Sequence, residues 1–180
     1  MTGRKSDPWR VPIAVGQIAE TGLQKTIVAN TAELHALAAA GDLRDVTEAR
    51  ATLTLTPAGG GKVHVTGRVT VRAGQTCVVT LDPIESLIDE PIDLVFAPAG
   101  QIPPLASTIE AGDDDETTPD LPEPIENGMI DIGRVATDAF FLAIDPYPRK
   151  HGVAFEPPFN ADDPHAHPFA ALASLKRSSD

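Results

Sequence analysis

Alternation of apolar and polar side chains over residues 49–97 constrains the fold more than any other feature of the sequence. Apolar residues return at every second position in four runs separated by glycine or proline, at residues 49–57, 61–73, 75–83 and 88–98. Period-two alternation is typical of a strand with one face in the core and the other in water. We therefore expect an antiparallel β-meander, with a sheet that curls or closes like a barrel.

Two short helices are expected beside the meander. In the first, at residues 31–40, Asn30 and Glu33 have the spacing of a capping box, and Gly41 is placed to end the helix. Asp131 is placed to cap the second helix, which the prolines at 146 and 148 end. Together with the meander, these helices indicate an α+β fold.

A single domain, at residues 9–150, accounts for most of the chain. Residues 107–126 hold eight acidic residues, three prolines and no basic residue, and such a segment buries too little apolar surface to offset its ordering entropy. We expect it to be a disordered acidic loop inserted into the domain. Residues 1–8 are expected to be a flexible N-terminus, and residues 151–180 a proline-rich linker with a C-terminal docking segment.

Charge and composition limit the classes of function. Fourteen basic and twenty-six acidic residues give a net charge of −12, which disfavours a protein that coats nucleic acid broadly. One cysteine excludes an internal disulfide and a cysteine-rich metal site. The sequence shows neither the apolar core of a secretory signal nor an apolar run long enough to span a membrane. We therefore expect a soluble protein of the cytoplasm.

Basic residues gather on one predicted face of the meander. Positions 49–81 contain no acidic residue, and in the second run the even positions are polar or basic while most odd positions are valine. Guanidinium and hydroxyl groups on a sheet face can contact phosphate or an acidic partner, although an ordinary solvated face has the same composition. The candidate interaction face comprises Arg50, Lys62, His64, Arg68 and Arg72.

Cys77 has a structural interpretation and a catalytic one. Gly74 is expected to turn the chain before the third run, whose alternation places Cys77 on the core face together with Leu81. A buried thiol behaves as a small apolar group with a raised pKa, which is the opposite of what a nucleophile needs. We therefore expect Cys77 to pack in the core, with a reactive thiol as the alternative.

A metal site is a further chemical alternative. Residues 162–167 bring Asp162, Asp163, His165 and His167 together in the sequence, but a metal site needs ligands that surrounding residues hold in place. The chain contains no phosphate-binding glycine loop, zinc-protease motif or nucleophile elbow. We expect no catalytic residue, no metal and no cofactor, and therefore a protein that is not an enzyme.

Three segments carry a family resemblance. They are GQTCVVTLDPIESLIDEPIDLVFAP, IDIGRVATDAFFLAIDPYPRKHG and the C-terminal PFAALASLK. In this order they resemble the YceD-like family of large ribosomal RNA subunit accumulation proteins, over about residues 9–176. The resemblance implies a bacterial protein needed for the accumulation or processing of 23S-type ribosomal RNA, and it supplies no catalytic residues.

The chain departs from the pattern of this family at two positions. Many relatives carry Cys-x-x-Cys where this chain has Cys77 and Thr80, so the resemblance leaves a metal or redox role without its second sulfur ligand. Arg134 stands where relatives often carry glutamate.

The resemblance and the basic face lead to one expected function and two alternatives. We expect a non-enzymatic factor in large-subunit biogenesis that binds pre-ribosomal RNA, or a ribosomal or assembly protein, through the candidate interaction face. The alternatives are an acidic adaptor for a basic ribosomal protein or a nuclease, without RNA contact, and a metal-dependent hydrolase. Neither a membrane nor a small-molecule substrate is expected as a partner. The candidate docking segment comprises Pro168, Phe169, Leu172, Leu175 and Lys176.

Overall fold

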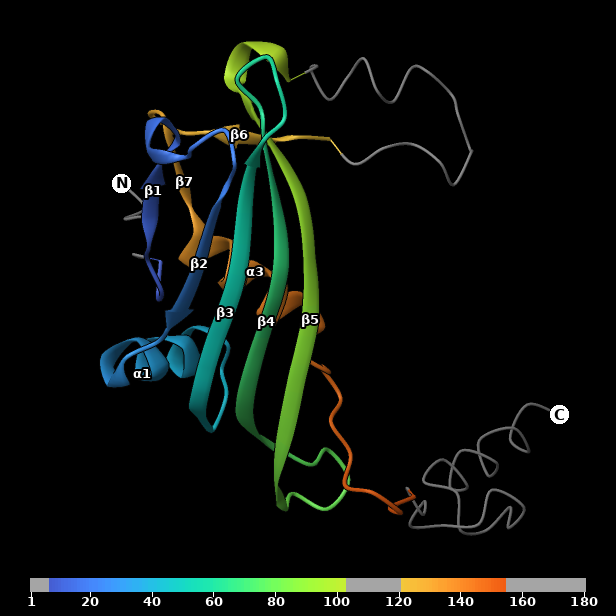
Figure 1. Ribbon diagram of the computed structural model, residues 1–180. Helices are drawn as coiled ribbons and strands as arrows, with labels where there is room; N and C mark the ends of the chain where they lie inside the picture. Colours follow the sequence, from blue (N-terminus) through green and yellow to red (C-terminus); the bar gives the residue numbers. More distant parts are fainter. Residues whose placement is uncertain (1–6, 103–120, 155–180) are drawn as a thin grey trace, which may run out of the picture.

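The computed structural model describes residues 7–102 and 121–154, which form a long, bent sheet with two helices and a small second sheet (Figure 1). The elements in chain order are β1 (Pro12–Ala14), the 3-10 turn η1 (Val15–Gln17), β2 (Leu23–Val28), α1 (Thr31–Ala40), β3 (Asp45–Pro57), β4 (Val63–Thr76), β5 (Pro83–Pro98), the 3-10 turn η2 (Ala99–Gln101), β6 (Glu123–Ile125), β7 (Met129–Asp131) and α3 (Ile132–Ala143).

Three long strands make the body of the larger sheet. Its strand order is β2-β3-β4-β5-β6, and every neighbouring pair is antiparallel except β5 and β6, which are parallel. β1 and β7 form a separate antiparallel pair. The succession β3, β4, β5 confirms the predicted antiparallel meander and the α+β class. The sheet is open, with β2 and β6 at its edges, so a barrel-like closure is not confirmed.

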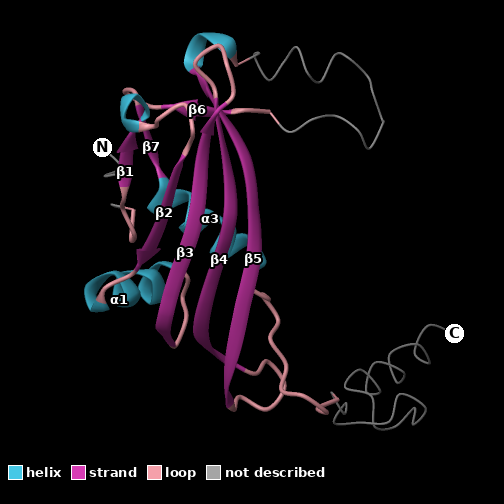
Figure 2. Ribbon diagram, viewed as in Figure 1, coloured by secondary structure: helices cyan, strands magenta, loops and turns pink. Residues whose placement is uncertain are grey.

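The period-two pattern sorts the side chains of the long strands onto two faces. At residues 49–55 of β3 and 63–73 of β4, the valine, leucine and alanine residues at odd positions are buried, while their even-numbered neighbours are exposed or half-buried. α3 packs against β4 and β5, and Figure 2 shows it crossing behind the strands. Trp9, which precedes β1, and Phe140, on α3, are each 1% exposed and are the largest side chains in this core.

The first helix begins and ends where the sequence predicts. The side chain of Asn30 accepts hydrogen bonds from the backbone N–H groups of Ala32 and Glu33, at 2.9 and 3.1 Å. In return, the backbone N–H of Asn30 donates to the side chain of Glu33 at 2.7 Å, which completes the capping box. α1 therefore occupies the predicted range. In the described part of the chain, no helix is long and apolar enough to cross a membrane.

Asp131 caps the second helix and also fixes its position. Its Oδ1 atom accepts hydrogen bonds from the backbone N–H groups of Gly133 and Arg134, at 3.1 and 3.2 Å. The same oxygen accepts a third, of 2.8 Å, from the backbone N–H of Val11. One carboxylate thus links the start of α3 to the segment that leads into β1.

The meander contains three long strands where the sequence predicts four. β4 continues through Gly74, which pairs with Asp45 and Glu85, so the turn predicted at Gly74 is wrong. The third predicted run, at residues 75–83, is not a strand, because residues 77–82 form the turn that leads into β5. This turn is closed by hydrogen bonds of 2.9 Å from Cys77 N–H to the Asp82 carbonyl and from Leu81 N–H to the Cys77 carbonyl.

The predicted acidic insertion is described only at its C-terminal end. There, residues 123–125 form β6 and pair with residues 96–98 of β5. Residues 1–6, 103–120 and 155–180 lie outside the described part of the chain. The predicted N-terminal, acidic and C-terminal segments therefore stay predictions over those residues.

β3 and β4 come very close together at Gly67. This glycine faces Leu53 in the register, with a backbone φ of +156°. A β-carbon at position 67 would overlap the carbonyl oxygen of Thr52 and lie 2.9 Å from the Cα of Leu53. The absence of a side chain therefore allows the two strands to pair here without distortion.

We expect Gly67→Ala to lower the free energy of unfolding by about 1–3 kcal/mol, because the added methyl group forces the two backbones apart. Gly100→Ala is the matched control, since a β-carbon at Gly100 meets no atom within 4 Å. Denaturant unfolding of both variants measures the difference. Equal stability of the two variants would contradict the close approach at Gly67.

Candidate interaction face

Four of the five predicted members of the candidate interaction face lie on the outer face of the sheet, away from α3. Arg50 on β3 and Arg72 on β4 are exposed between buried neighbours. Arg68 is exposed beside buried Val69, and His64 is half-buried between two buried valines. The register confirms that the β3 and β4 members share one surface, since Arg50 pairs with Thr70. Lys62 is different: it precedes β4 and lies in the β3–β4 turn, where its carbonyl accepts a 2.9 Å hydrogen bond from Ala58 N–H.

The basic side chains of β4 are paired with carboxylates of the neighbouring strands. His64 Nε2 lies 2.6 Å from Asp93 Oδ1, and Arg68 Nη1 lies 2.7 Å from Asp89 Oδ1. Arg72 makes two contacts, from Nη1 to Glu85 Oε1 at 3.2 Å and from Nε to Glu48 Oε2 at 3.6 Å. The outer face is therefore a ladder of alternating charges, and not a positively charged surface.

The pairs on this ladder are exposed to water. About half of the side-chain surface of Arg68 and of Asp89 is accessible, and a solvent-exposed ion pair contributes little to stability. The hydrogen bond and the charge of Asp89 raise the pKa of the Arg68 guanidinium above its ordinary value, so that group is charged throughout the physiological range. Because each pair is weak, a binding partner can displace it at small cost.

Sequence reasoning missed the acidic half of this ladder. Glu85, Asp89 and Asp93 all belong to β5, beyond the acid-free stretch at residues 49–81, and Glu48 precedes it. Their spacing of four places the β5 carboxylates on one face of that strand, so the signal was present in the sequence. Strand pairing was needed to show that this face adjoins the arginines.

Arg50 is the exception among the arginines. It is exposed on β3, between Val28 of β2 and Thr70 of β4, and it makes no ion pair with any residue in the described ranges. Hydroxyl groups lie beside it, since Thr70 is its partner on β4 and Thr52 lies two residues further along β3. Thr52 in turn shares a 3.1 Å hydrogen bond with Thr26 of β2. This is the part of the face best suited to contact an anion.

Cys77 lies at the start of the β4–β5 turn and is 0% exposed, as expected for a packed thiol. Its predicted companion is not buried, because Leu81 has a backbone φ of +62° in the turn and is 76% exposed. β4 ends at Thr76, so Cys77 and Leu81 do not lie on a strand, and the prediction that they share a core face is wrong.

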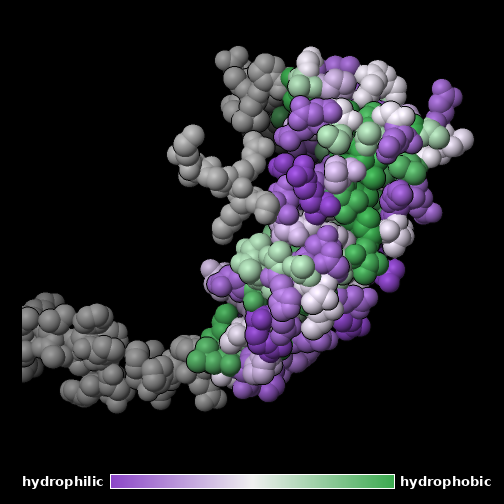
Figure 3. All heavy atoms as spheres, turned by 90° about the vertical axis from the view of Figure 1, so that its left-hand side faces the viewer, coloured by the Kyte–Doolittle hydropathy of each residue, from purple (hydrophilic) through white to green (hydrophobic). Residues whose placement is uncertain are grey.

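A segment from the end of the domain closes over this turn. At residues 145–150, the carbonyl of Pro148 accepts a 3.0 Å hydrogen bond from Val78 N–H. The backbone N–H of Lys150 donates to Cys77 Sγ at 3.3 Å, and Lys150 Nζ lies 3.0 Å from Asp82 Oδ2. Figure 3 shows a small hydrophobic patch near the lower end of the described surface, apart from the larger one higher up. Two segments separated by about 70 residues therefore form one structural unit.

Hydrogen bonds to the sulfur lower the pKa of the Cys77 thiol to about 6, against an ordinary value of 9.0. The hydroxyl of Thr80 makes the largest contribution, followed by the backbone N–H of Lys150, and these outweigh the effect of burial. The predicted raised pKa is therefore wrong, although the burial is confirmed. Because the sulfur is inaccessible, its acidity stabilises the turn and does not make it a nucleophile toward solutes.

The remaining predicted sites lie outside the described residues. They are the acidic and histidine residues at 162–167 and the docking segment from Pro168 to Lys176. Within residues 7–102 and 121–154, no group of three or more histidine, cysteine, aspartate or glutamate side chains is arranged to hold a metal ion.

A protein-family model described as large ribosomal RNA subunit accumulation protein YceD matches residues 65–176. The match begins in β4 and includes the Cys77 turn, β5, α3 and the segment at residues 145–150. It is shorter at its N-terminal end than the resemblance at residues 9–176. No curated protein and no solved structure matches the chain at a significant level.

We expect the thiol of Cys77 to titrate near pH 6 and Thr80→Val to raise that midpoint, because valine cannot donate a hydrogen bond to the sulfur. The ultraviolet absorbance of the thiolate, followed against pH with Cys77→Ser as the blank, measures both values. An unchanged midpoint in Thr80→Val would contradict the assigned hydrogen bond.

The direction of this pKa shift also predicts how stability depends on pH. A thiol with a lower pKa in the folded chain stabilises the fold above the unfolded pKa, and this contribution is lost as the pH falls toward about 6. Unfolding free energies of the wild type and of Cys77→Ser, measured at both ends of this range, should therefore diverge more at the higher pH.

Proposed function

Since the chain belongs to the family of the large ribosomal RNA subunit accumulation protein YceD, we propose that it is a non-enzymatic binding factor in the biogenesis of the large ribosomal subunit. In this role it supports the accumulation or processing of 23S-type ribosomal RNA in the bacterial cytoplasm. The family match is the observation that carries this proposal.

The shape of the molecule supports binding as its mode of action. The outer face of β3, β4 and β5 is a long, exposed surface of threonine and charged side chains, with no helix over it in the described residues. Such a surface offers many weak contacts to a macromolecule. It does not gather titratable groups in a dry cavity, as acid–base catalysis requires.

The charge ladder favours a protein as the partner of this face. RNA binding depends on lysine and arginine side chains that neutralise phosphates. On this face, the β4 basic groups already pair with carboxylates, which would repel a phosphate backbone. A protein surface with alternating charges can exchange these pairs for intermolecular ones. The net charge of −12 points the same way, toward a basic ribosomal or assembly protein.

Direct contact with ribosomal RNA is the second candidate, and Arg50 is the observation that favours it. Its guanidinium group is exposed among threonines and pairs with no carboxylate in the described residues. An RNA contact would therefore be local and centred on the β2–β3 side of the face.

Loss of the gene is expected to lower large-subunit ribosomal RNA relative to small-subunit ribosomal RNA, because the large-subunit precursor would no longer be protected during assembly. Quantifying both RNAs in cells with and without the gene measures the ratio, and expression of the wild-type chain should restore it. An unchanged ratio would rule out the proposed function.

Charge reversal on the outer face, Arg68→Glu/Arg72→Glu, is expected to weaken association with large-subunit precursors, because the introduced glutamates would repel carboxylates of the partner that the arginines attract. Lys25→Glu/Arg44→Glu is the matched control, since Lys25 lies on the opposite side of the sheet and Arg44 precedes β3. Affinity purification with and without RNase measures the effect and identifies the partner class.

Equal recovery of precursors by the two double variants would remove the sheet face from the proposal. Loss of recovery after RNase treatment, together with loss in Arg50→Glu, would show that RNA is the direct partner.

A further inference from the structure

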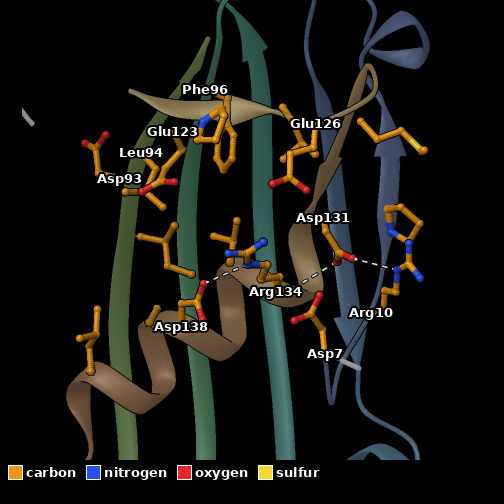
Figure 4. A pocket seen from close by; sticks show the side chains of 18 of the residues that line it. Asp7, Arg10, Asp93, Leu94, Phe96, Glu123, Glu126, Asp131, Arg134 and Asp138 are labelled. Atoms are coloured by element: carbon orange, nitrogen blue, oxygen red, sulfur yellow. Dashed lines mark hydrogen bonds and ion pairs between the residues drawn. The ribbon is translucent and has the colours of Figure 1, made fainter. Parts of the chain in front are cut away.

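A groove opens on the side of the sheet opposite the candidate interaction face. It has a volume of about 940 Å³ and lies between α3, β5 and the β6–β7 segment (Figure 4). Pockets for small ligands range from about 300 to 1,000 Å³, so this groove is at the upper end of that range. All its lining residues belong to the described part of the chain.

The floor of the groove is apolar. Ile92 and Phe96 of β5 and Val135 of α3 line it and are almost fully buried. Two further apolar side chains at its margin are accessible, with Met129 41% exposed and Leu142 89% exposed. Leu142 lies seven residues, or about two turns, after Val135 on α3, so both face the same side of the helix. The apolar side of α3 therefore continues beyond the groove into solvent. An accessible apolar surface of this kind is typical of a site that a partner covers.

The rim of the groove is strongly acidic. Seven carboxylates line it against two guanidinium groups, those of Arg10 and Arg134. Both arginines already have acidic neighbours, since Arg10 Nε lies 3.6 Å from Asp131 Oδ2 and Arg134 Nε lies 3.6 Å from Asp138 Oδ2. Figure 4 shows Arg134 between Asp138 and Asp131, with Arg10 beside Asp131. The carboxylates that form no ion pair within the described residues are Asp7, Glu90, Glu123 and Glu126.

Asp138 is the rim carboxyl group whose pKa is shifted, and partial burial is the main cause. Desolvation raises the pKa of Asp138 above its ordinary value, the charge of Asp7 raises it further, and Arg134 opposes both. The other charged groups that line the groove are Arg10, Glu90, Asp93, Glu123, Glu126 and Asp131. A cation brought into the groove would therefore relieve repulsion between carboxylates that the chain itself leaves uncompensated.

We propose that this groove binds a basic amphipathic helical segment of a protein partner, with its apolar side chains on the floor and its lysine or arginine side chains on the rim. Helix binding in a groove uses this combination of apolar anchors and flanking charge. The inference rests on the proposed function only in identifying the partner as a ribosomal or assembly protein. The acidic rim excludes an RNA backbone from the same place.

Two segments of the chain itself are the competing occupants. Residues 1–6 contain Arg4 and Lys5 but no apolar side chain apart from Met1, so they offer little to the floor. Residues 168–176 contain Phe169, Leu172 and Leu175 but only one basic residue, Lys176. A separate basic segment matches both the floor and the rim better than either of them.

The direct test measures binding of the full chain to a fluorescent peptide of about 15 residues, long enough to form a helix, with leucines on one side and lysines on the other. We expect saturable binding, weakened up to about fivefold for each neutralised carboxylate in Glu123→Gln/Glu126→Gln. Leu142→Ser should also weaken it. Glu20→Gln/Asp42→Asn removes the same charge at two exposed positions outside the groove and should leave binding unchanged.

Three outcomes would contradict the proposal that the peptide binds in this groove. They are equal binding of a scrambled peptide of the same composition, equal loss in Glu20→Gln/Asp42→Asn, and displacement of the peptide by a single-stranded RNA. Tighter binding in Arg4→Ser/Lys5→Ser or in Phe169→Ser/Leu172→Ser would assign the groove to the corresponding segment of the chain, and not to a partner.

The same variants separate this inference from the proposed function. If only the groove is wrong, deletion of the gene still lowers the ratio of large- to small-subunit ribosomal RNA, and Glu123→Gln/Glu126→Gln restores it fully. If only the proposed function is wrong, the ratio does not change on deletion while the peptide still binds in the groove.

Discussion

Burial of one face of a long sheet is the interaction on which the rest of this structure depends. The odd positions of β3 and β4 form an apolar surface that water must not reach, and α3 and the residues around Trp9 are needed to cover it. Asp131 joins α3 to the segment around Trp9, because its carboxylate caps α3 and also accepts a hydrogen bond from the backbone N–H of Val11. Gly133 makes this junction possible, since a β-carbon there would overlap the carbonyl oxygen of Trp9.

Local signals in the sequence predicted the elements well, and signals that depend on pairing did not. The capping box at Asn30 and the cap at Asp131 act through residues two or three positions away, so the helices could be found from the sequence alone. The alternation in β4 likewise identified the outward positions of His64, Arg68 and Arg72. Their carboxylate partners could not be assigned in this way, because the contact of Arg68 with Asp89 depends on the register between β4 and β5.

The turn at Cys77 shows a second limit of pattern reasoning. Its sequence reads as a strand because Val78, Val79 and Leu81 are apolar, yet hydrogen bonds within the turn and to Pro148 determine its shape. The acidity of the thiol has the same origin, since one of its donors is Lys150, which is remote in sequence. The groove could not be predicted from the sequence either, because its lining residues come from the N-terminal segment, β5, β6, β7 and α3.

The parallel pairing of β5 with β6 has a consequence for the acidic stretch between them. Phe96 pairs with Glu123 and Pro98 with Ile125, so the chain leaves the sheet and returns to it at adjacent strands. The free energy of closing a loop grows only logarithmically with its length, at about 0.6 kcal/mol for each doubling. Evolution can therefore lengthen, shorten or rewrite this stretch at little thermodynamic cost, while the sheet and the helix that frame it keep their geometry. It is a natural place for lineage-specific sequence, and equally for a reporter or affinity tag.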